Sequence, residues 1–143
     1  MQLVGPYVLV GQSFGGLNMQ LYARLHPAEA AGLVLVDAAH EDSYDPAIAP
    51  CAVCGGVDYA ESARQVRAAP PLPDLPLVVL AHARPSVLPA AAEARWPAWQ
   101  HDLAARAPRG RLVVAERSGH NIHLDEPDLV VAAIRDVVGA VRQ

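Results

Sequence analysis

The chain contains the stretch YVLVGQSFGG at residues 7–16, in which an apolar run leads directly into the pattern Gly-x-Ser-x-Gly. A serine can attack a carbonyl only when its Oγ stands clear of the backbone, and a sharp turn from a strand into a helix achieves this by holding the serine at positive φ. Such a turn needs small neighbours, so a Cβ is expected to collide at Gly11 and Gly15, while Gly16 lets the helix approach the sheet. The stretch therefore predicts a strand, a nucleophilic Ser13 and a helix, in that order.

Four short apolar runs, rich in valine and leucine and without alternation, are spread along the chain, as is typical of buried parallel strands. They cover Tyr7–Val10, Leu33–Val36, Leu75–Ala81 and Leu112–Ala115. The helical patterns that separate and follow them cover Gly16–Leu25, Tyr59–Ala68, Ala90–Ala107 and Pro127–Val141. Pro97 is expected to break the third of these helices. The alternation of strand and helix predicts an α/β fold, with a mostly parallel sheet flanked by helices on both faces.

A second polar motif follows the last strand-like run. Residues 117–123 read RSGHNIH, which places His120 in the loop before the final helix. Ligands meet an α/β sheet at the carboxyl ends of its strands, so an imidazole there can take a proton from Ser13 and return it to a leaving group. His123 lies three residues further on. The residues alone leave open which histidine does this, or whether each is only a hydrogen-bonded loop residue.

The segments GPYVLVGQSFGG, GLVLVDAAHED, LPLVVLAH and SGHNIHLDEP, in this order, resemble the α/β-hydrolase superfamily from its nucleophile elbow onward. The resemblance spans nearly the whole chain and implies a partial α/β-hydrolase fold that lacks the N-terminal strands of the family's domain. It implies that His120 is the base and that His123 packs beneath the loop. It also implies a C-terminal part of a hydrolase, either a fragment or a truncated gene product, whose first strand is an artificial sheet edge.

The acid that would orient His120 stands at a less usual place. Many members of the family carry it just after the penultimate strand, but here no carboxylate follows that strand until Glu93. The family's other place is the tip of the strand after the nucleophile's own, where this chain has Asp37. We therefore expect Asp37 to hold Nδ1 of His120 and to stabilise its imidazolium. The alternatives are Asp42, Glu41, no acid at all, and an Asp37 that only caps a turn.

The sequence identifies only one of the two backbone donors that an oxyanion hole needs. One donor would be the backbone N–H of Phe14, the residue after the nucleophile. In the family the other donor comes from a loop after an earlier strand, and no such loop precedes Ser13 here. A lost donor costs roughly 10²–10³ in rate. The alternative to an active enzyme is therefore an incomplete or non-catalytic hydrolase-fold fragment that needs an N-terminal segment for activity.

Residues 1–143 are expected to form a single, partial α/β-hydrolase domain, within which residues 38–74 occupy the place of the family's cap. This insert is short and consists of an irregular stretch followed by one helix. The irregular stretch is centred on Pro46, Pro50 and Gly55-Gly56. Substrate selection is expected from a small lid that contains Tyr44, Ile48 and Tyr59.

Two further motifs carry weaker signals. Cys51-x-x-Cys54 in the insert can be half a zinc site or a redox pair, but neither a second ligand pair nor a thioredoxin-like setting accompanies it. Trp96, Trp99 and Gln100 lie on the helical stretch after the third strand. Aromatic residues at helical spacing favour packing over binding.

The composition bounds the remaining possibilities. The 143 residues are 52% hydrophobic and 18% charged, with a net charge of −4, which is typical of a soluble globular domain. No basic run favours nucleic acid or an anionic membrane surface, and the longest apolar runs are strand-sized. The first residues carry no basic region of a secretory signal, and two cysteines set no disulfide framework, so a cytoplasmic location is expected.

Together, the residues and the resemblance imply a serine hydrolase for a small carboxylic ester, lactone or related acyl compound. Ser13 would attack, His120 would carry the proton, Asp37 would orient His120, and the Phe14 N–H would hold the oxyanion. The serine at the elbow disfavours the relatives that use an aspartate nucleophile. The expected partner is the small acyl substrate, and neither a cofactor nor a metal is expected.

Overall fold

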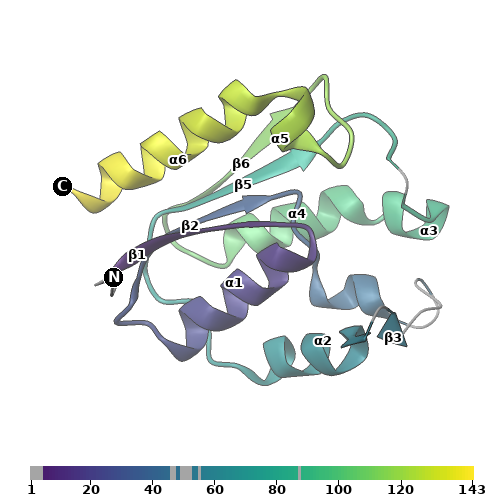
Figure 1. Ribbon diagram of the computed structural model, residues 1–143, viewed down its shortest axis with the longest axis horizontal. Coiled ribbons are helices and arrows are strands. Elements are labelled where there is room, and N and C mark those ends of the chain that lie inside the picture. The colour runs from purple at the N-terminus through teal and green to yellow at the C-terminus, as the bar shows by residue number, and fades with distance from the viewer. Residues whose placement is uncertain (1–4, 46–47, 49–52, 55, 87) are drawn as a thin grey trace.

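The computed structural model describes residues 5–45, 48, 53–54, 56–86 and 88–143, and its centre is a parallel sheet of four strands in the order β1-β2-β5-β6 (Figure 1). The strands are β1 (Tyr7–Gln12), β2 (Ala30–Val36), β5 (Leu77–His82) and β6 (Gly110–Ala115). Each neighbouring pair runs parallel. The carboxyl ends of all four strands therefore meet at one edge, which is where ligands approach such a sheet.

Helices cover both faces of this sheet, as the sequence predicts. Helix α6 lies on one face, and α1 and α4 lie on the other (Figure 1). The helices are α1 (Phe14–Leu25), α2 (Tyr59–Ala68), α3 (Ala90–Glu93), α4 (Trp96–Ala105), α5 (Ile122–Asp125) and α6 (Pro127–Val141), with a 3₁₀ turn η1 (Glu41–Tyr44). Within the described residues, none of these helices combines the length and the apolarity that a membrane crossing requires.

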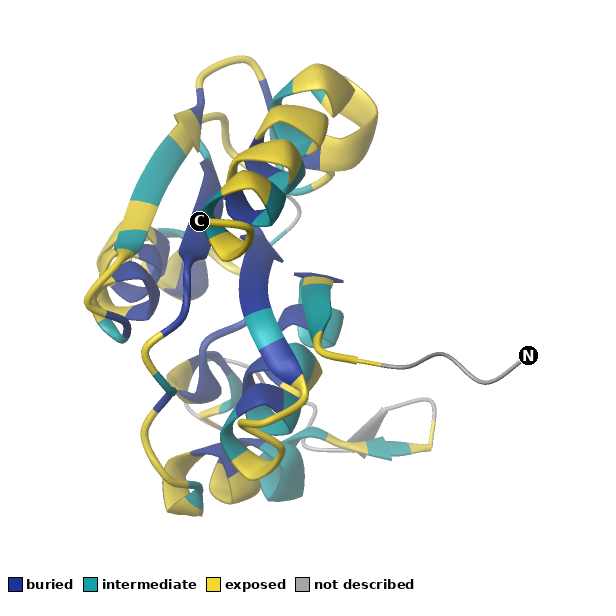
Figure 2. Cartoon of the chain, turned by 90° about the vertical axis from the view of Figure 1, so that its left-hand side faces the viewer, coloured by how far each residue is buried: buried dark blue, intermediate teal, exposed yellow. Residues whose placement is uncertain are grey.

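Two hydrophobic cores lie on the two faces of the sheet, because successive strand residues point to opposite sides. Leu33 and Leu35 of β2 pack in a cluster with Leu103 of α4. Val34 of the same strand packs in a cluster with Val137 of α6. Figure 2 shows the central strands buried and the helices exposed on their outer sides. Burial of one such leucine contributes about 1.5–3 kcal/mol, so the two cores fix the strand ends firmly.

The third predicted helix is divided into α3 and α4, but the division does not occur at Pro97. The helices are separated at residues 94–95, and Pro97 lies in the first turn of α4. A proline costs no hydrogen bond there, because the first N–H groups of a helix have no partner within it. Pro97 therefore belongs to the beginning of the second helix.

The insert contains more regular structure than its sequence predicts. A two-stranded antiparallel hairpin joins β3 (Val53–Cys54) to β4 (Val57–Asp58), where an irregular stretch was expected. Gly56 turns the chain between them at φ 82°, a conformation that glycine adopts without steric cost. Pro46 and Pro50 lie outside the described residues.

Strand β1 forms one edge of the described sheet. It pairs only with β2 there, and Val10 near its end is 42% exposed. Parallel strands are usually paired on both sides, so an edge strand with free backbone groups can accept another strand. The resemblance to the α/β-hydrolase superfamily implied that this first strand would lie at an edge of the sheet.

Candidate active site

Ser13 occupies a sharp turn between β1 and α1. Its φ of 52° and ψ of −125° lie in a region of backbone conformation that residues other than glycine rarely adopt. The Ser13 N–H donates to the carbonyl of Val36 at 3.2 Å, and its carbonyl accepts from the N–H of Ala39 at 2.9 Å. These bonds to β2 and to the segment after it hold the strained turn in place. The predicted order of strand, serine and helix is confirmed.

Two of the three glycines around Ser13 are needed for close approach. A Cβ on Gly11 would lie 2.5 Å from the carbonyl oxygen of Gly15, and a Cβ on Gly16 would lie 2.3 Å from the Cβ of Ala38. A Cβ on Gly15 would instead point into open space. The predicted collision is therefore confirmed at Gly11 and wrong at Gly15, while Gly16 does let the helix approach the chain after β2.

Asp37 follows β2 and has a completely buried side chain that four donors surround. Its Oδ2 lies 2.6 Å from Nδ1 of His120 and 2.7 Å from Nδ1 of His82. Its Oδ1 accepts from Nε1 of Trp96 at 2.7 Å and from the backbone N–H of His82 at 3.1 Å. A residue that only capped a turn would not collect these long-range donors. The backbone of Asp37 is itself at positive φ, 46°.

The donors keep Asp37 ionised. Burial raises the pKa of this carboxyl, but the hydrogen bonds from His120, His82 and Trp96 outweigh that effect and hold its pKa below the usual value. Asp37 is therefore a carboxylate at neutral pH. Its negative charge is what would stabilise a neighbouring imidazolium.

His120 lies in the loop between β6 and α5, and this loop is fixed on two sides. Nε2 of Gln12, the residue before Ser13, donates to the carbonyl of His120 at 3.3 Å. The buried Ser118 donates through Oγ to Oδ2 of Asp125 at 3.0 Å. Because Nδ1 of His120 faces Asp37, Nε2 is the ring atom left to exchange a proton.

His123 does not pack beneath the loop. It is exposed on α5, and its neighbour Ile122 takes the buried position, in a cluster with Val137 of α6. A single helical turn that directs residue 122 inward must direct residue 123 outward. The implied burial of His123 is wrong, and of the two loop histidines it is His120 that is bonded to Asp37.

Sequence reasoning missed the contribution of β5 to the site. His82 ends this strand, and its Nε2 lies 3.1 Å from Oε2 of Glu93 on α3. Trp96, expected only to pack, is buried and also donates to Asp37. One signal was available in the sequence, because His82 directly follows the predicted strand Leu75–Ala81 and the carboxyl ends of parallel strands meet at one edge of the sheet.

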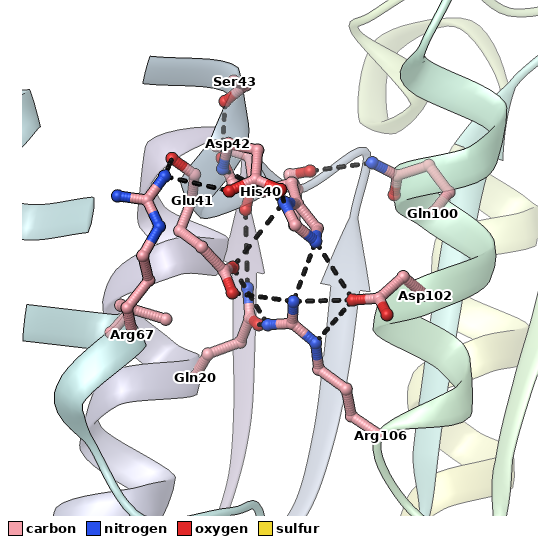
Figure 3. A network of polar contacts seen from close by, with 12 residues as sticks. Gln20, His40, Glu41, Asp42, Ser43, Arg67, Gln100, Asp102 and Arg106 are labelled. Atoms are coloured by element: carbon pink, nitrogen blue, oxygen red, sulfur yellow. Dashed lines mark hydrogen bonds and ion pairs between the residues drawn. The ribbon is translucent and has the colours of Figure 1, made fainter. Parts of the chain in front are cut away.

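The alternative acids Glu41 and Asp42 belong to a separate polar network (Figure 3). Arg106 donates to both carboxylate oxygens of Glu41, at 2.9 and 3.0 Å. Asp42 pairs with Arg67 at 2.9 Å. Each of these carboxylates is thus engaged by an arginine, while the carboxylate bonded to His120 is that of Asp37.

Side chains of the insert lie beside the elbow. Phe14 is the first residue of α1, so its N–H has no partner inside the helix. Its ring meets that of Tyr59 edge-on at 4.9 Å and that of Tyr44 at 6.1 Å. Ile48 instead packs with Trp96 and other residues near α3 and α4.

Within the part of the chain that the structure describes, Asp37, His82 and His120 form a group that could hold a metal ion, since one ligand atom of each lies within 4.8 Å of the others. Zinc bonds of about 2.0–2.1 Å in a tetrahedron space the ligand atoms about 3.3 Å apart. The Asp37 oxygen lies only 2.6 and 2.7 Å from the two ring nitrogens, which are hydrogen-bond distances. Of the Cys-x-x-Cys motif, Cys51 lies outside the described residues.

Comparison with known proteins identifies the fold. No family model matches the chain, and no curated protein matches it. Among solved structures, a thermophilic esterase from Thermogutta terrifontis is 20% identical with a TM-score of 0.63, over 97% of this chain and 66% of its own. A putative lipase from Acinetobacter baumannii is 18% identical with a TM-score of 0.66, over 97% of this chain and 62% of its own. A CIB-like hydrolase from Thermoplasma acidophilum is 18% identical with a TM-score of 0.53, over 90% of this chain and 49% of its own.

The chain thus spans between about half and two thirds of the length of these three structures. The matches cover 90–97% of this chain, so most of its sheet and helices fall within the part that is shared. The chain has the α/β-hydrolase fold in a partial form.

Proposed function

We propose that this protein is a serine hydrolase that acts on a small carboxylic ester, lactone or related acyl compound through an acyl-enzyme. The observation that carries the proposal is the hydrogen bond of 2.6 Å between Asp37 and Nδ1 of His120, at the sheet edge where Ser13 occupies its strained turn. The likeness to an esterase and a lipase supports hydrolysis as the reaction class.

In the first step, Ser13 Oγ attacks the acyl carbonyl while Nε2 of His120 takes its proton. The carbonyl oxygen becomes negative, and in this proposal the N–H of Phe14 donates to it; the start of α1 at Phe14 supports this, because that N–H has no partner within the helix. Asp37 stabilises the positive charge that His120 then carries. The C–O bond to the leaving group breaks, and His120 returns the proton to the departing alcohol.

In the second step, water replaces the alcohol. His120 takes a proton from this water, whose oxygen attacks the acyl carbon, and the ester bond to Ser13 breaks. The proton returns to Oγ of Ser13 and the free acid leaves. Residues 38–74 act as a small lid in this proposal, and Tyr44 and Tyr59 would shape the acyl site because they contact Phe14.

The test is hydrolysis of p-nitrophenyl acetate by the wild-type chain and by Ser13→Ala. We expect a burst of p-nitrophenol followed by steady turnover in the wild type, and neither in the variant. Ser62→Ala is the matched control, because the Ser62 hydroxyl donates to the carbonyl of Asp58 on an outer helix. Equal rates in Ser13→Ala and Ser62→Ala would refute the proposal.

A second candidate function is that of a hydrolase-fold module that becomes active only when another segment completes it. Two observations favour it: β1 is an edge of the described sheet, and the chain spans 49–66% of three similar structures. The test compares the chain with a version extended by the sequence encoded upstream of residue 1. A monomeric chain with full ester hydrolysis rejects this candidate, whereas association on size exclusion and activity only in the extended version support it.

A further inference from the structure

His82 is a buried titratable side chain that the proposed mechanism does not use. Its ring is 5% exposed, and both of its nitrogens face carboxylates. Nδ1 lies 2.7 Å from Oδ2 of Asp37, and Nε2 lies 3.1 Å from Oε2 of Glu93. The two carboxylates come from different elements, the end of β2 and α3, so the histidine bridges them.

This geometry selects one protonation state of His82. A neutral imidazole has one N–H, so either tautomer would turn a nitrogen lone pair toward a carboxylate oxygen. The imidazolium alone donates to Asp37 and to Glu93 at once, and charge-assisted bonds of this kind are the strong ones.

Glu93 is arranged to remain an acceptor. Its Oε1 accepts from the N–H of Ser86 at 2.9 Å and from the Ser86 hydroxyl. That hydroxyl in turn accepts from the N–H of Leu88 at 3.2 Å, which leaves its own proton for Glu93. Burial raises the pKa of Glu93, but the bonds from Ser86 and His82 outweigh it and lower the pKa below its usual value.

The remaining neighbours of His82 also suit a cation. The Trp96 ring stacks on it with centroids 5.9 Å apart and an angle of 23°, within the range of a cation–π contact. Burial lowers the pKa of His82, but the hydrogen bonds and charges of Asp37 and Glu93 outweigh it, so the net pKa is above the usual value. The groups that face His82 are thus two carboxylates, an indole and the ring of His120.

We propose that His82 is held as an imidazolium between Asp37 and Glu93, and that this fixed positive charge positions the Asp37 carboxylate for its bond to His120. His82 touches Asp37 and not the substrate, so it is a positioning residue. Its meaning for catalysis rests on the proposed serine hydrolase function, whereas its charge state does not. The position where many relatives carry the acid would here hold a cation that pairs with the acid.

The test is NMR titration of the histidine rings in the ¹⁵N-labelled chain, without substrate. In the wild type, we expect both nitrogens of His82 to carry protons at pH 7. Glu93→Gln should make His82 lose its proton at a lower pH, because only one of its two charged partners remains. Glu61→Gln, which removes an exposed carboxylate paired with Arg64, should leave the His82 titration unchanged.

Three results would overturn the proposal: a singly protonated His82 at pH 7 in the wild type, an unchanged His82 titration in a folded Glu93→Gln, or stoichiometric zinc uptake that displaces the His82 protons. The ring signals do not depend on turnover. A diprotonated His82 in a chain that hydrolyses no ester would leave the charge assignment standing and refute only the proposed function.

Discussion

Oδ2 of Asp37 lies 2.6 Å from Nδ1 of His120, although 83 positions separate the two residues in the chain. The parallel sheet brings them together, because Asp37 follows β2 and His120 follows β6, and both strands end at the same edge of the sheet with β5 between them. The bond to the Asp37 carboxylate places the proton of a neutral His120 on Nδ1, so Nε2 is the atom that acts as the base in the proposed mechanism.

Asp37→Asn should lower turnover of an aryl ester by up to about 10⁴, because the amide keeps the shape but removes the charge that stabilises the His120 imidazolium. The measurement is kcat at pH 8, with near-UV circular dichroism to verify that the variant is folded. Turnover equal to that of the wild type would transfer the role to another group or to no acid at all.

His120→Ala should abolish acylation, whereas His123→Ala should have little effect. Of these two histidines, His120 is bonded to Asp37, whereas His123 is exposed on α5. The burst of p-nitrophenol measures acylation directly. Equal losses in the two variants, or a larger loss in His123→Ala, would contradict the assignment of the base.

Gly11→Ala should lower the free energy of unfolding by about 1–3 kcal/mol or more, because its Cβ would lie 2.5 Å from a backbone oxygen that cannot move freely. Gly15→Ala is the matched control on the other side of Ser13. The added Cβ would point into open space on a helix, so the substitution should leave the free energy of unfolding unchanged or raise it by up to about 1 kcal/mol. Urea unfolding compares the two, and similar values would contradict the geometry of the turn.

Stability should pass through a maximum between about pH 4 and pH 6.5. Because folding lowers the pKa of Asp37 from 3.8, its contribution is present above that value and is lost as the pH falls through the folded pKa. Because folding raises the pKa of His82 from 6.5, its contribution is present below that value and is lost as the pH rises through the folded pKa. Urea unfolding from pH 3 to 9 checks this, and the alkaline loss should be smaller in His82→Asn.

The sequence predicts the sheet and much of the helical layer because local patterns determine them. The bounds of α2 and α6 agree with the predicted Tyr59–Ala68 and Pro127–Val141. The predicted position of the break between α3 and α4 was wrong, because a proline such as Pro97 is compatible with the first turn of a helix as well as with a break. The hairpin in the insert was missed because strands of two residues give no periodicity to detect.

The site was only partly predictable for a different reason. Ser13 and His120 stand in local motifs, and Asp37 followed from its place after a strand. The roles of His82 and Glu93 depend on which strand neighbours which and on how α3 turns back to the sheet. Such contacts are tertiary, and residue types or spacing along the chain do not encode them.

The central claim is that Ser13 is an activated nucleophile, and labelling with a fluorophosphonate followed by peptide mass spectrometry tests it most directly. The reagent phosphonylates a serine only where a base removes its proton, so it needs no knowledge of the substrate. The account predicts one label, on the peptide that contains Ser13, absent from Ser13→Ala and greatly reduced in His120→Ala. A label that persists in Ser13→Ala, or no label on a folded wild-type chain, would contradict it.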